Sequence, residues 1–399
     1  MKGILEEYLR SFPAVVLTGA RQVGKTTLLK SLLSKSHRYV LLEDPDVRGQ
    51  AQDDPRSFLS HYPPPVIFDE FQYVPHLTSY LQGLIDQDRQ KTGQFVLTGS
   101  QNFLMMEQVS QSLAGRVGLL SLYGLEREEL PLPKGPLHEE RDIAQILYRG
   151  TFPELWMKRD LKPSHWFGSY LRTYLERDVR NLTQVGNLLS FERFIRLCAI
   201  RTGQILNLSE LARDCGISQP TAQRWLSILI QTYQVHLIEP FYENLSSRIR
   251  KSPKIYFMDT GLASYLMGFR NASLIPHSPQ LGALFETLVI TNFIKFHAAE
   301  GEVPEHYYIQ AKTGLEVDLM LRRGTSWALY EIKYRRTLGS QDLKQLLDAK
   351  EILKKKVVGL YRLSPVSESF VQKEVTLHPW DQVWEIQKRE SIASNSGKS

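Results

Sequence analysis

Apolar residues in the first hundred positions gather in short runs, and each run ends in small or acidic residues. Runs of about four to eight apolar residues are typical of buried strands. They occupy residues 15–18, 38–44, 65–72 and 94–102. An amphipathic helix is predicted over residues 4–12, before the first run. The pattern predicts an α/β fold with a parallel sheet, whose strands deliver their carboxyl ends to one edge.

The first run leads directly into residues 19–26, GARQVGKT, which match the complete pattern G-x-x-x-x-G-K-[ST]. The two glycines allow backbone N–H groups to point at phosphate oxygens, at the start of a helix whose dipole favours anions. Lys25 is expected to bridge the β- and γ-phosphates, and Thr26 to hold Mg²⁺. The residues expected to contact ATP or GTP are Gly19, Ala20, Arg21, Gln22, Val23, Gly24, Lys25, Thr26 and Thr27.

Further candidates follow the next strands. Asp69 is expected to hold the Mg²⁺ shell and Glu70 to polarise the attacking water; the alternative is a pair of capping acids. Ser100 would sense the γ-phosphate or lie in an ordinary turn. Arg116 would neutralise transition-state charge in its own subunit or a neighbour's, or be a surface arginine.

Residues 206–239 carry the pattern of two short helices joined by a tight turn. Ser209 is expected to cap the first helix and Gly216 to end it, and a second helix starts directly after Ser218. This spacing predicts a helix-turn-helix, and a strand over residues 234–241 would make it winged. The polar candidates for contacts in a DNA major groove are Gln219, Thr221, Gln223 and Arg224. Winged helices also serve as lids on ATPases and as protein-interaction modules.

A β-hairpin is predicted over residues 314–333, after an apolar helix that contains one acid, Glu286. Such an acid is costly to bury without a partner or a metal ion. The hairpin contributes Asp318 and Glu331, and Lys333 shares the face of Glu331 because they are two residues apart. Carboxylate oxygens suit Mg²⁺ or Mn²⁺, and a lysine beside the metal stabilises charge on a phosphodiester. The alternative is a set of surface ion pairs.

This order of residues resembles the D…E-x-K motif of restriction-endonuclease-like nucleases, which have an upstream helical glutamate. The resemblance implies Glu286, Asp318 and Glu331 as metal ligands and Lys333 as the catalytic lysine. It implies either a metal-dependent nuclease or a remnant that binds DNA or regulates. Asp259, at the end of an earlier apolar run, is more typical of a helix cap than of a functional residue.

Composition narrows these hypotheses. The 399 residues suffice for two or three domains, and 42% hydrophobic with 23% charged residues is typical of a soluble protein. A run of about 18 apolar residues is absent from the sequence, and the acidic start argues against a secretory signal. Cys198 and Cys215 are expected to be reduced core thiols, which fits the cytoplasm. The net charge of +6 favours a polyanionic partner, but a charge of this size does not establish one by itself.

The motifs together resemble a large family of uncharacterised prokaryotic AAA-type ATPases, related to the archaeal ATPases, in which the ATPase domain is joined to a C-terminal domain of unknown function. The similarity rests on the phosphate loop, FDEFQYVP, FVLTGSQNF and SLAGRV, and extends to residues 149–155 and 170–179. The implied organisation is a P-loop ATPase domain over residues 1–135, a helical and winged-helix domain over 136–245, an α/β restriction-endonuclease-like domain over 246–385 and a disordered tail over 386–399.

We therefore expect a cytoplasmic ATPase that binds ATP and Mg²⁺ and forms a homo-oligomer, such as a ring. It would use ATP hydrolysis to remodel, translocate on or process DNA, including branched DNA, and nuclease activity at a second metal site is a further candidate. The alternative is a nucleotide-gated regulator or scaffold whose C-terminal domain is only structural.

Overall fold

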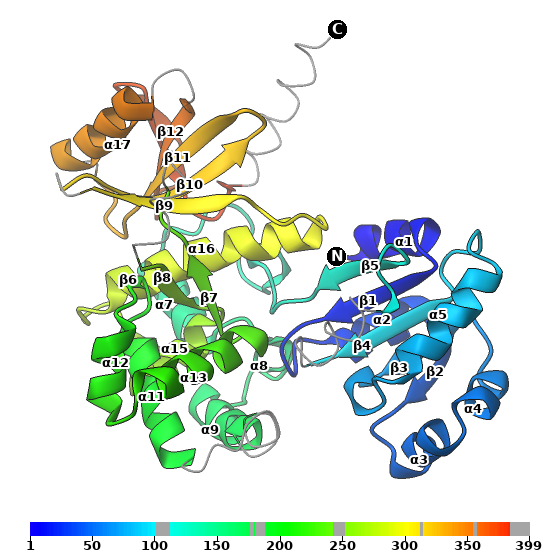
Figure 1. Ribbon diagram of the computed structural model, residues 1–399. Coiled ribbons are helices and arrows are strands. Elements are labelled where there is room, and N and C mark those ends of the chain that lie inside the picture. The colour runs from blue at the N-terminus through cyan, green and yellow to red at the C-terminus, as the bar shows by residue number, and fades with distance from the viewer. Residues whose placement is uncertain are drawn as a thin grey trace, which may run out of the picture. The chain divides into compact units, whose positions relative to one another are not determined.

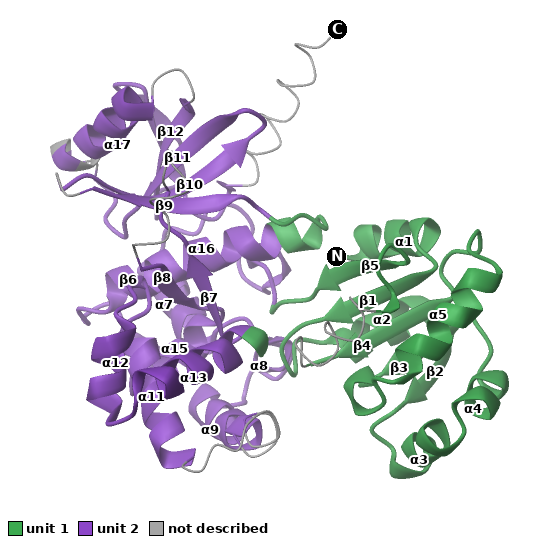
Figure 2. Cartoon of the chain, in the orientation of Figure 1, with its two compact units in different colours: residues 1–124, 231–233, 297–303 green, residues 125–230, 234–296, 304–399 purple. Residues whose placement is uncertain are grey.

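The computed structural model describes residues 1–100, 112–175, 179, 188–241, 252–311, 314–337, 339–353 and 357–383. The chain forms two compact units (Figure 2). Unit 1 contains residues 1–124, 231–233 and 297–303, and unit 2 contains residues 125–230, 234–296 and 304–399. The tail predicted over residues 386–399 lies outside the described residues. Within the described part of the chain, every helix is too short or too polar to span a bilayer.

Unit 1 is built on a parallel sheet with the strand order β2-β3-β4-β1-β5 (Figure 1). The strands are β1 (Ala14–Thr18), β2 (Arg38–Leu41), β3 (Val66–Asp69), β4 (Phe95–Gly99) and β5 (Val117–Ser121). All pair in parallel, which confirms the parallel sheet predicted from the apolar runs. The loops after β1, β3 and β4 therefore meet at one edge.

Helices cover both faces of this sheet. They are α1 (Lys2–Ser11), α2 (Lys25–Leu33), α3 (Pro45–Asp53), α4 (Pro55–His61) and α5 (Leu77–Gln87). On one face, Val15 and Leu17 of β1 pack with residues of α1 and α2. On the other face, Val16 packs with residues of α3, α4 and α5. Burial on both sides explains why the strands read as continuous apolar runs.

The middle of the chain is mainly helical. Its helices are α7 (Glu140–Arg149), α8 (Pro153–Met157), α9 (Pro163–Tyr174), α11 (Leu188–Ile200), α12 (Leu208–Cys215), α13 (Gln219–Gln231) and α15 (Thr260–Leu266). A three-stranded sheet accompanies them in the order β6 (Gln204–Ile205), β8 (Lys254–Phe257) and β7 (Val235–Ile238). The boundary proposed at residue 246 falls between β7 and β8, which are paired strands of this sheet.

The predicted pair of helices is present, with one correction at its start. Gly216 ends α12 in the left-handed conformation, as expected. The cap of α12 is Asn207, whose side chain accepts a hydrogen bond from the backbone N–H of Glu210, and not Ser209, which lies inside the helix. Asparagine caps as well as serine does, so sequence preference could not separate the two positions.

The C-terminal part of unit 2 contains a mixed six-stranded sheet with the order β13-β14-β12-β11-β10-β9. Its elements are α16 (Leu281–Ala299), β9 (His306–Gln310), β10 (Glu316–Arg323), β11 (Ser326–Ile332), α17 (Ser340–Leu353), β12 (Val357–Ser364), β13 (Phe370–Gln372) and β14 (Val375–Pro379). The predicted hairpin is confirmed as the antiparallel pair β10 and β11. β12 lies parallel to β11 on its other side, after the chain has passed through α17.

Candidate functional site

The phosphate-binding loop lies between β1 and α2, where the sequence predicts it. Gly24 precedes α2 with φ of 100°, and Gly19 has φ of 147°. A Cβ atom on Gly19 would stand 2.0 Å from the carbonyl oxygen of Leu122, so a larger residue cannot occupy this position without moving the backbone. Two glycines are therefore required by the shape of the loop itself.

The functional side chains of the loop face inward. Lys25 is 7% exposed, and its ammonium group donates hydrogen bonds of 2.8 Å to the carbonyl oxygens of Gly19 and Ala20. Val23 is buried, and Arg21 is half-buried. Gln22 and Thr27 are exposed. The loop thus holds its lysine over the backbone that would cradle phosphate.

The two nucleotide motifs meet at Asp69. The Thr26 hydroxyl donates to Asp69 Oδ2 over 2.7 Å, because β3 delivers Asp69 to the edge of the sheet where α2 begins. Tyr39, in the neighbouring strand β2, donates to the same oxygen over 2.5 Å. Burial and the nearby carboxylate raise the pKa of Tyr39, so it remains a hydrogen-bond donor. Oxygen donors of this kind, from Thr26 and Asp69, fit the preference of Mg²⁺.

Glu70 and Ser100 lie at the same edge. Glu70 has φ of 57°, an uncommon conformation for a residue with a side chain, and its carboxylate accepts a hydrogen bond from the Gln72 amide. Ser100 follows β4 and is 3% exposed, and its hydroxyl has no hydrogen-bond partner among the described residues. A buried hydroxyl that no described residue satisfies is consistent with the predicted phosphate sensor.

Arg116 lies at the opposite end of the strands, away from the phosphate loop. β5 pairs with β1 in register, with Val117 opposite Ala14, so Arg116 is beside the amino end of β1. The phosphate loop follows the carboxyl end of β1, about 13 Å further along the strand. Arg116 also donates two hydrogen bonds, of 2.8 and 2.9 Å, to Asp86 of α5. The predicted action of Arg116 on its own chain's nucleotide does not fit this geometry, whereas action on a neighbour's remains a prediction.

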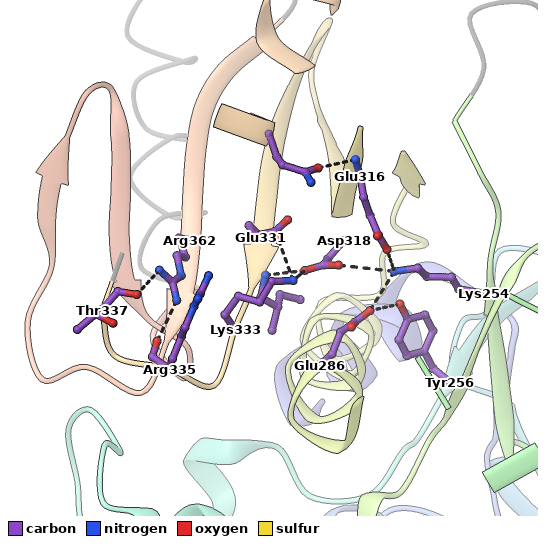
Figure 3. Close-up of polar contacts among 12 residues, drawn as sticks. Lys254, Tyr256, Glu286, Glu316, Asp318, Glu331, Lys333, Arg335, Thr337 and Arg362 are labelled. Atoms are coloured by element: carbon purple, nitrogen blue, oxygen red, sulfur yellow. Dashed lines mark hydrogen bonds and ion pairs between the residues drawn. The ribbon is translucent and has the colours of Figure 1, made fainter. Parts of the chain in front are cut away.

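A second polar cluster lies where α16 meets the hairpin β10–β11, and it contains the four residues singled out in the sequence (Figure 3). Lys333 Nζ is 2.7 Å from Glu331 and 3.2 Å from Asp318. Asp318 Oδ2 also accepts a hydrogen bond of 2.9 Å from the backbone N–H of Ile332. Asp318 and Glu331 are 2% and 5% exposed, whereas Lys333 is half-buried, so the carboxylates of these ion pairs do not lie on the surface as the alternative interpretation assumed.

Three residues of the cluster, Lys254, Tyr256 and Glu316, were not predicted from the sequence. Lys254 of β8 lies 3.3 Å from Glu286, 3.0 Å from Glu316 and 3.6 Å from Asp318. The Tyr256 hydroxyl donates to Glu286 over 2.6 Å. In the sequence, Lys254 and Tyr256 are polar residues two apart in an apolar strand. That spacing places them on one face and was the signal available to find them.

Charge and burial act against each other in this cluster. Burial raises the pKa of Glu286 to about 7, assisted by the neighbouring charge of Asp318. Burial also disfavours the charged form of Asp318, but the ammonium groups of Lys333 and Lys254 outweigh it and lower the pKa of this carboxyl. Burial opposes the charge on Lys254 as well, yet the surrounding carboxylates raise its pKa above the usual value. Lys254 is therefore a charged ammonium group at neutral pH.

The predicted metal ligands of this cluster do not form a ready metal site. In the part of the chain that the structure describes, no three carboxylate, imidazole or thiol groups converge to hold a metal ion. The physical reason is that ammonium groups lie on both sides of Asp318: Lys254 lies between it and Glu286, and Lys333 lies between it and Glu331.

The segment at residues 149–155 has a structural explanation. Asp259 caps α15 as expected, accepting from the N–H of Leu262, and it also accepts from the N–H and hydroxyl of Thr151, at 2.6 and 2.9 Å. The buried Lys295 ammonium donates to the Thr151 hydroxyl over 2.7 Å. Gly150 packs against Asp259. This network joins α7, α15 and α16 within unit 2.

Comparison with known proteins divides the chain into three matched regions. Residues 11–130 match the family model of an AAA domain. Residues 140–273 and 281–383 match two domains of unknown function, DUF8612 and DUF4143.

Two curated relatives extend over most of the chain. The uncharacterized proteins Rv2008c of Mycobacterium tuberculosis (strain H37Rv) and Mb2031c of Mycobacterium bovis are each 31% identical over 330 residues, which is 82% of this chain and 72% of theirs.

Solved structures show weaker likenesses. A Walker-type ATPase of Pyrococcus abyssi, PABY2304, is 17% identical with a TM-score of 0.43, and covers 66% of this chain and 94% of its own. A variant of RuvB from Thermotoga maritima is 17% identical with a TM-score of 0.27, and covers 59% and 87%. Likenesses of this degree support no inference about activity or partners.

Proposed function

This chain belongs to the family of the uncharacterised mycobacterial proteins Rv2008c and Mb2031c, and from this premise we propose that it is an AAA-type ATPase that hydrolyses ATP to act on DNA. The observation that carries the ATPase half is the contact between Thr26 and Asp69, which joins the phosphate loop to the acidic end of β3. In P-loop ATPases these two positions share one Mg²⁺ ion.

Each residue at this edge would have a separate task. Bound Mg²⁺ would supply positive charge at the β- and γ-phosphates, and Thr26 and Asp69 would hold it. Lys25 would leave its two backbone acceptors and contact the phosphates. Glu70 would orient the attacking water and Ser100 would contact the γ-phosphate. The left-handed backbone at Glu70 supports this role, because such conformations gather at functional sites.

The DNA half of the proposal is supported by the surface of α13. Gln219, Gln223 and Arg224 are exposed at its amino end, whereas Ala222 and Trp225 are buried beneath them. The polar face is therefore available to a partner. The arrangement of α12, α13 and the strands β7 and β8 supports a winged helix, whose second helix would enter a major groove.

The C-terminal domain is the proposed site of a metal-dependent nuclease activity. The supporting observation is that Glu286, Asp318, Glu331 and Lys333 come together on α16 and the hairpin. A nicking assay with Mg²⁺ or Mn²⁺ tests it on wild-type protein, Asp318→Ala and Lys333→Ala. Cleavage that both variants lose supports a nuclease. Equal cleavage by all three would point to contamination or to another site, and would leave a nucleotide-gated regulator with a structural C-terminal domain as the better description.

The decisive experiment measures ATP turnover against single-stranded, duplex, forked and four-way DNA. We expect DNA to raise turnover, most for the structure that the protein recognises, and Lys25→Ala to abolish activity with and without DNA. Lys35→Ala removes an exposed lysine of the same domain and is the matched control. Arg224→Ala should reduce the stimulation by DNA and leave basal turnover unchanged.

The same experiment tests action on DNA and ATP hydrolysis separately. Turnover that DNA does not change, together with no DNA binding at low salt in ATP and Mg²⁺, would contradict the DNA half and favour the regulator. Absence of any turnover would contradict the ATPase half.

A further inference from the structure

Lys254 occupies the centre of the acidic cluster in unit 2. Its ammonium group is within 3.0–3.6 Å of carboxylates on two elements: Glu286 on α16, and Glu316 and Asp318 on β10. Only 3% of the lysine is exposed. It reaches the cluster from β8, a strand of the three-stranded sheet and not of the sheet that carries the hairpin. Figure 3 shows the side chain pointing between Glu286 and Asp318.

This position is where a divalent cation would have to bind. A Mg²⁺ ion held by Glu286 and Asp318 would stand about 2.0–2.1 Å from their oxygens, between the two carboxylates. Lys254 Nζ already bridges them, at 3.3 and 3.6 Å. A dication and an ammonium group in the same buried space would repel each other strongly. The two cations therefore exclude each other.

The second lysine, Lys333, does not remove this exclusion. Lys333 neutralises the other side of Asp318 and pairs with Glu331. Each carboxylate of the predicted ligand set thus has an ammonium partner, as buried charges require. The Tyr256 hydroxyl also donates to Glu286 Oε1, the oxygen that Lys254 contacts.

We propose that Lys254 is the resident cation of this cluster, and that a divalent metal ion binds between Glu286 and Asp318 only after the ammonium group has been withdrawn or removed. One consequence rests on the proposed nuclease function: cleavage is blocked while Lys254 stays in place. Lys254 is here a positioning residue that controls access to the site.

The test counts bound Mn²⁺ by electron paramagnetic resonance in the full chain without nucleotide. Lys254→Met keeps the length of the side chain and removes its charge. We expect this variant to bind one Mn²⁺ per chain at Mn²⁺ concentrations that leave this cluster empty in wild-type protein, which corresponds to a Kd lower by at least about tenfold. Mn²⁺ should also raise its Tm, and Lys254→Met combined with Asp318→Asn should lose both effects. Lys344→Met, on the exposed face of α17, is the matched control and should behave as wild type.

Two results would overturn the proposal. One is a folded Lys254→Met that binds no more Mn²⁺ than wild-type protein. The other is a wild-type chain that binds Mn²⁺ in a way that Asp318→Asn or Glu286→Gln abolishes, and this comparison decides the matter even if Lys254→Met does not fold. Metal counting needs neither DNA nor ATP, so its failure is distinct from a failure of DNA-stimulated turnover or of the nicking assay.

Discussion

At the scale of single residues, Asp69 accepts hydrogen bonds from two hydroxyl groups on different elements, Thr26 and Tyr39. The next residue, Glu70, is turned into the left-handed conformation and bonded to Gln72. Two adjacent carboxylates are thus held in different positions by their backbone and by their donors. One is held beside the phosphate loop, and the other remains at the edge where a water molecule would attack.

We expect Glu70→Gln to bind ATP with little change in affinity and to hydrolyse it about 10²- to 10⁴-fold more slowly, because the amide cannot polarise water. Nucleotide binding and single-turnover hydrolysis measure the two effects separately. Glu7→Gln changes an exposed carboxylate on α1 and should leave both unchanged. Hydrolysis by Glu70→Gln at the wild-type rate would show that another group orients the water.

The residues of the nucleotide site and of the acidic cluster were predictable to different degrees. Lys25 and Thr26 belong to a motif whose geometry is local, because strand, loop and helix follow one another directly. Asp69 required only that two strands end at the same edge. Tyr39 and Lys254 were not found, because their contacts depend on which strands become neighbours, and periodicity carries no information on strand order.

At the scale of elements, the junction of α7 and α15 depends on the absence of a side chain. Gly150 has φ of 68°, and a Cβ atom there would lie 2.2 Å from Asp259 Oδ1. We expect Gly150→Ala to lower the free energy of unfolding by roughly 2–4 kcal/mol, from backbone strain and displacement of the cap. All six tryptophans lie in unit 2, so fluorescence during urea unfolding reports on it.

Gly282→Ala is the control for this prediction. Gly282 lies in α16, where a Cβ atom would meet nothing within 4 Å. The change should be neutral or slightly stabilising, since alanine is the better helix former. Equal effects of the two substitutions would mean that Asp259 moves aside easily.

Two histidines link β7 and β9. His236 Nε2 lies 2.8 Å from His306 Nε2, and burial, together with His306, lowers the pKa of His236 to about 3. A lowered pKa in the folded state stabilises the protein above the usual value of 6.5, and this contribution is lost as the pH falls towards 3.

We expect wild-type protein to lose about 2 kcal/mol of unfolding free energy between pH 7.5 and pH 5 through this group. His236→Gln should lack that part of the loss, whereas His76→Gln, at an exposed position, should retain it. Urea unfolding at the two pH values gives the comparison. An identical pH dependence in wild type and His236→Gln would contradict the assignment.

Helices and strands could be predicted where a single stretch of sequence determines them. The prediction failed where a strand pairs with another that is far away in the sequence. The hairpin β10–β11 was predictable, because its strands are joined by a tight turn. The three-stranded sheet was only partly predicted, since β8 pairs with β6 about fifty residues earlier. The strands β13 and β14 were missed; β13 is three residues long, too short for a clear alternating pattern.

At the scale of the whole molecule, Arg116 raises the question of assembly. Its place at the end of the strands remote from the phosphate loop fits action on a neighbouring chain's nucleotide better than action on its own. We expect Lys25→Ala and Arg116→Ala each to be inactive alone and to recover about a quarter of wild-type turnover when mixed, because half of the loops are intact and half of these have an intact neighbour.

Recovery should depend on protein concentration and should require subunit exchange. Asp86→Ala removes the partner of Arg116 without removing the arginine, and serves as the control for damage to α5. Mixtures that stay inactive under conditions in which the chains exchange subunits would rule out a role in trans and leave Arg116 as a surface ion pair.

The close approach of Gly19 to Leu122 has a mechanical consequence. The first glycine of the phosphate loop rests on the carbonyl of a residue two positions before the end of unit 1's first segment, at Gly124. A side chain at this position would therefore push Leu122, and the chain leading to Gly124, away from the loop. The segment by which the chain leaves unit 1 is thus packed against the first glycine of the phosphate loop, and its path depends on that position having no side chain.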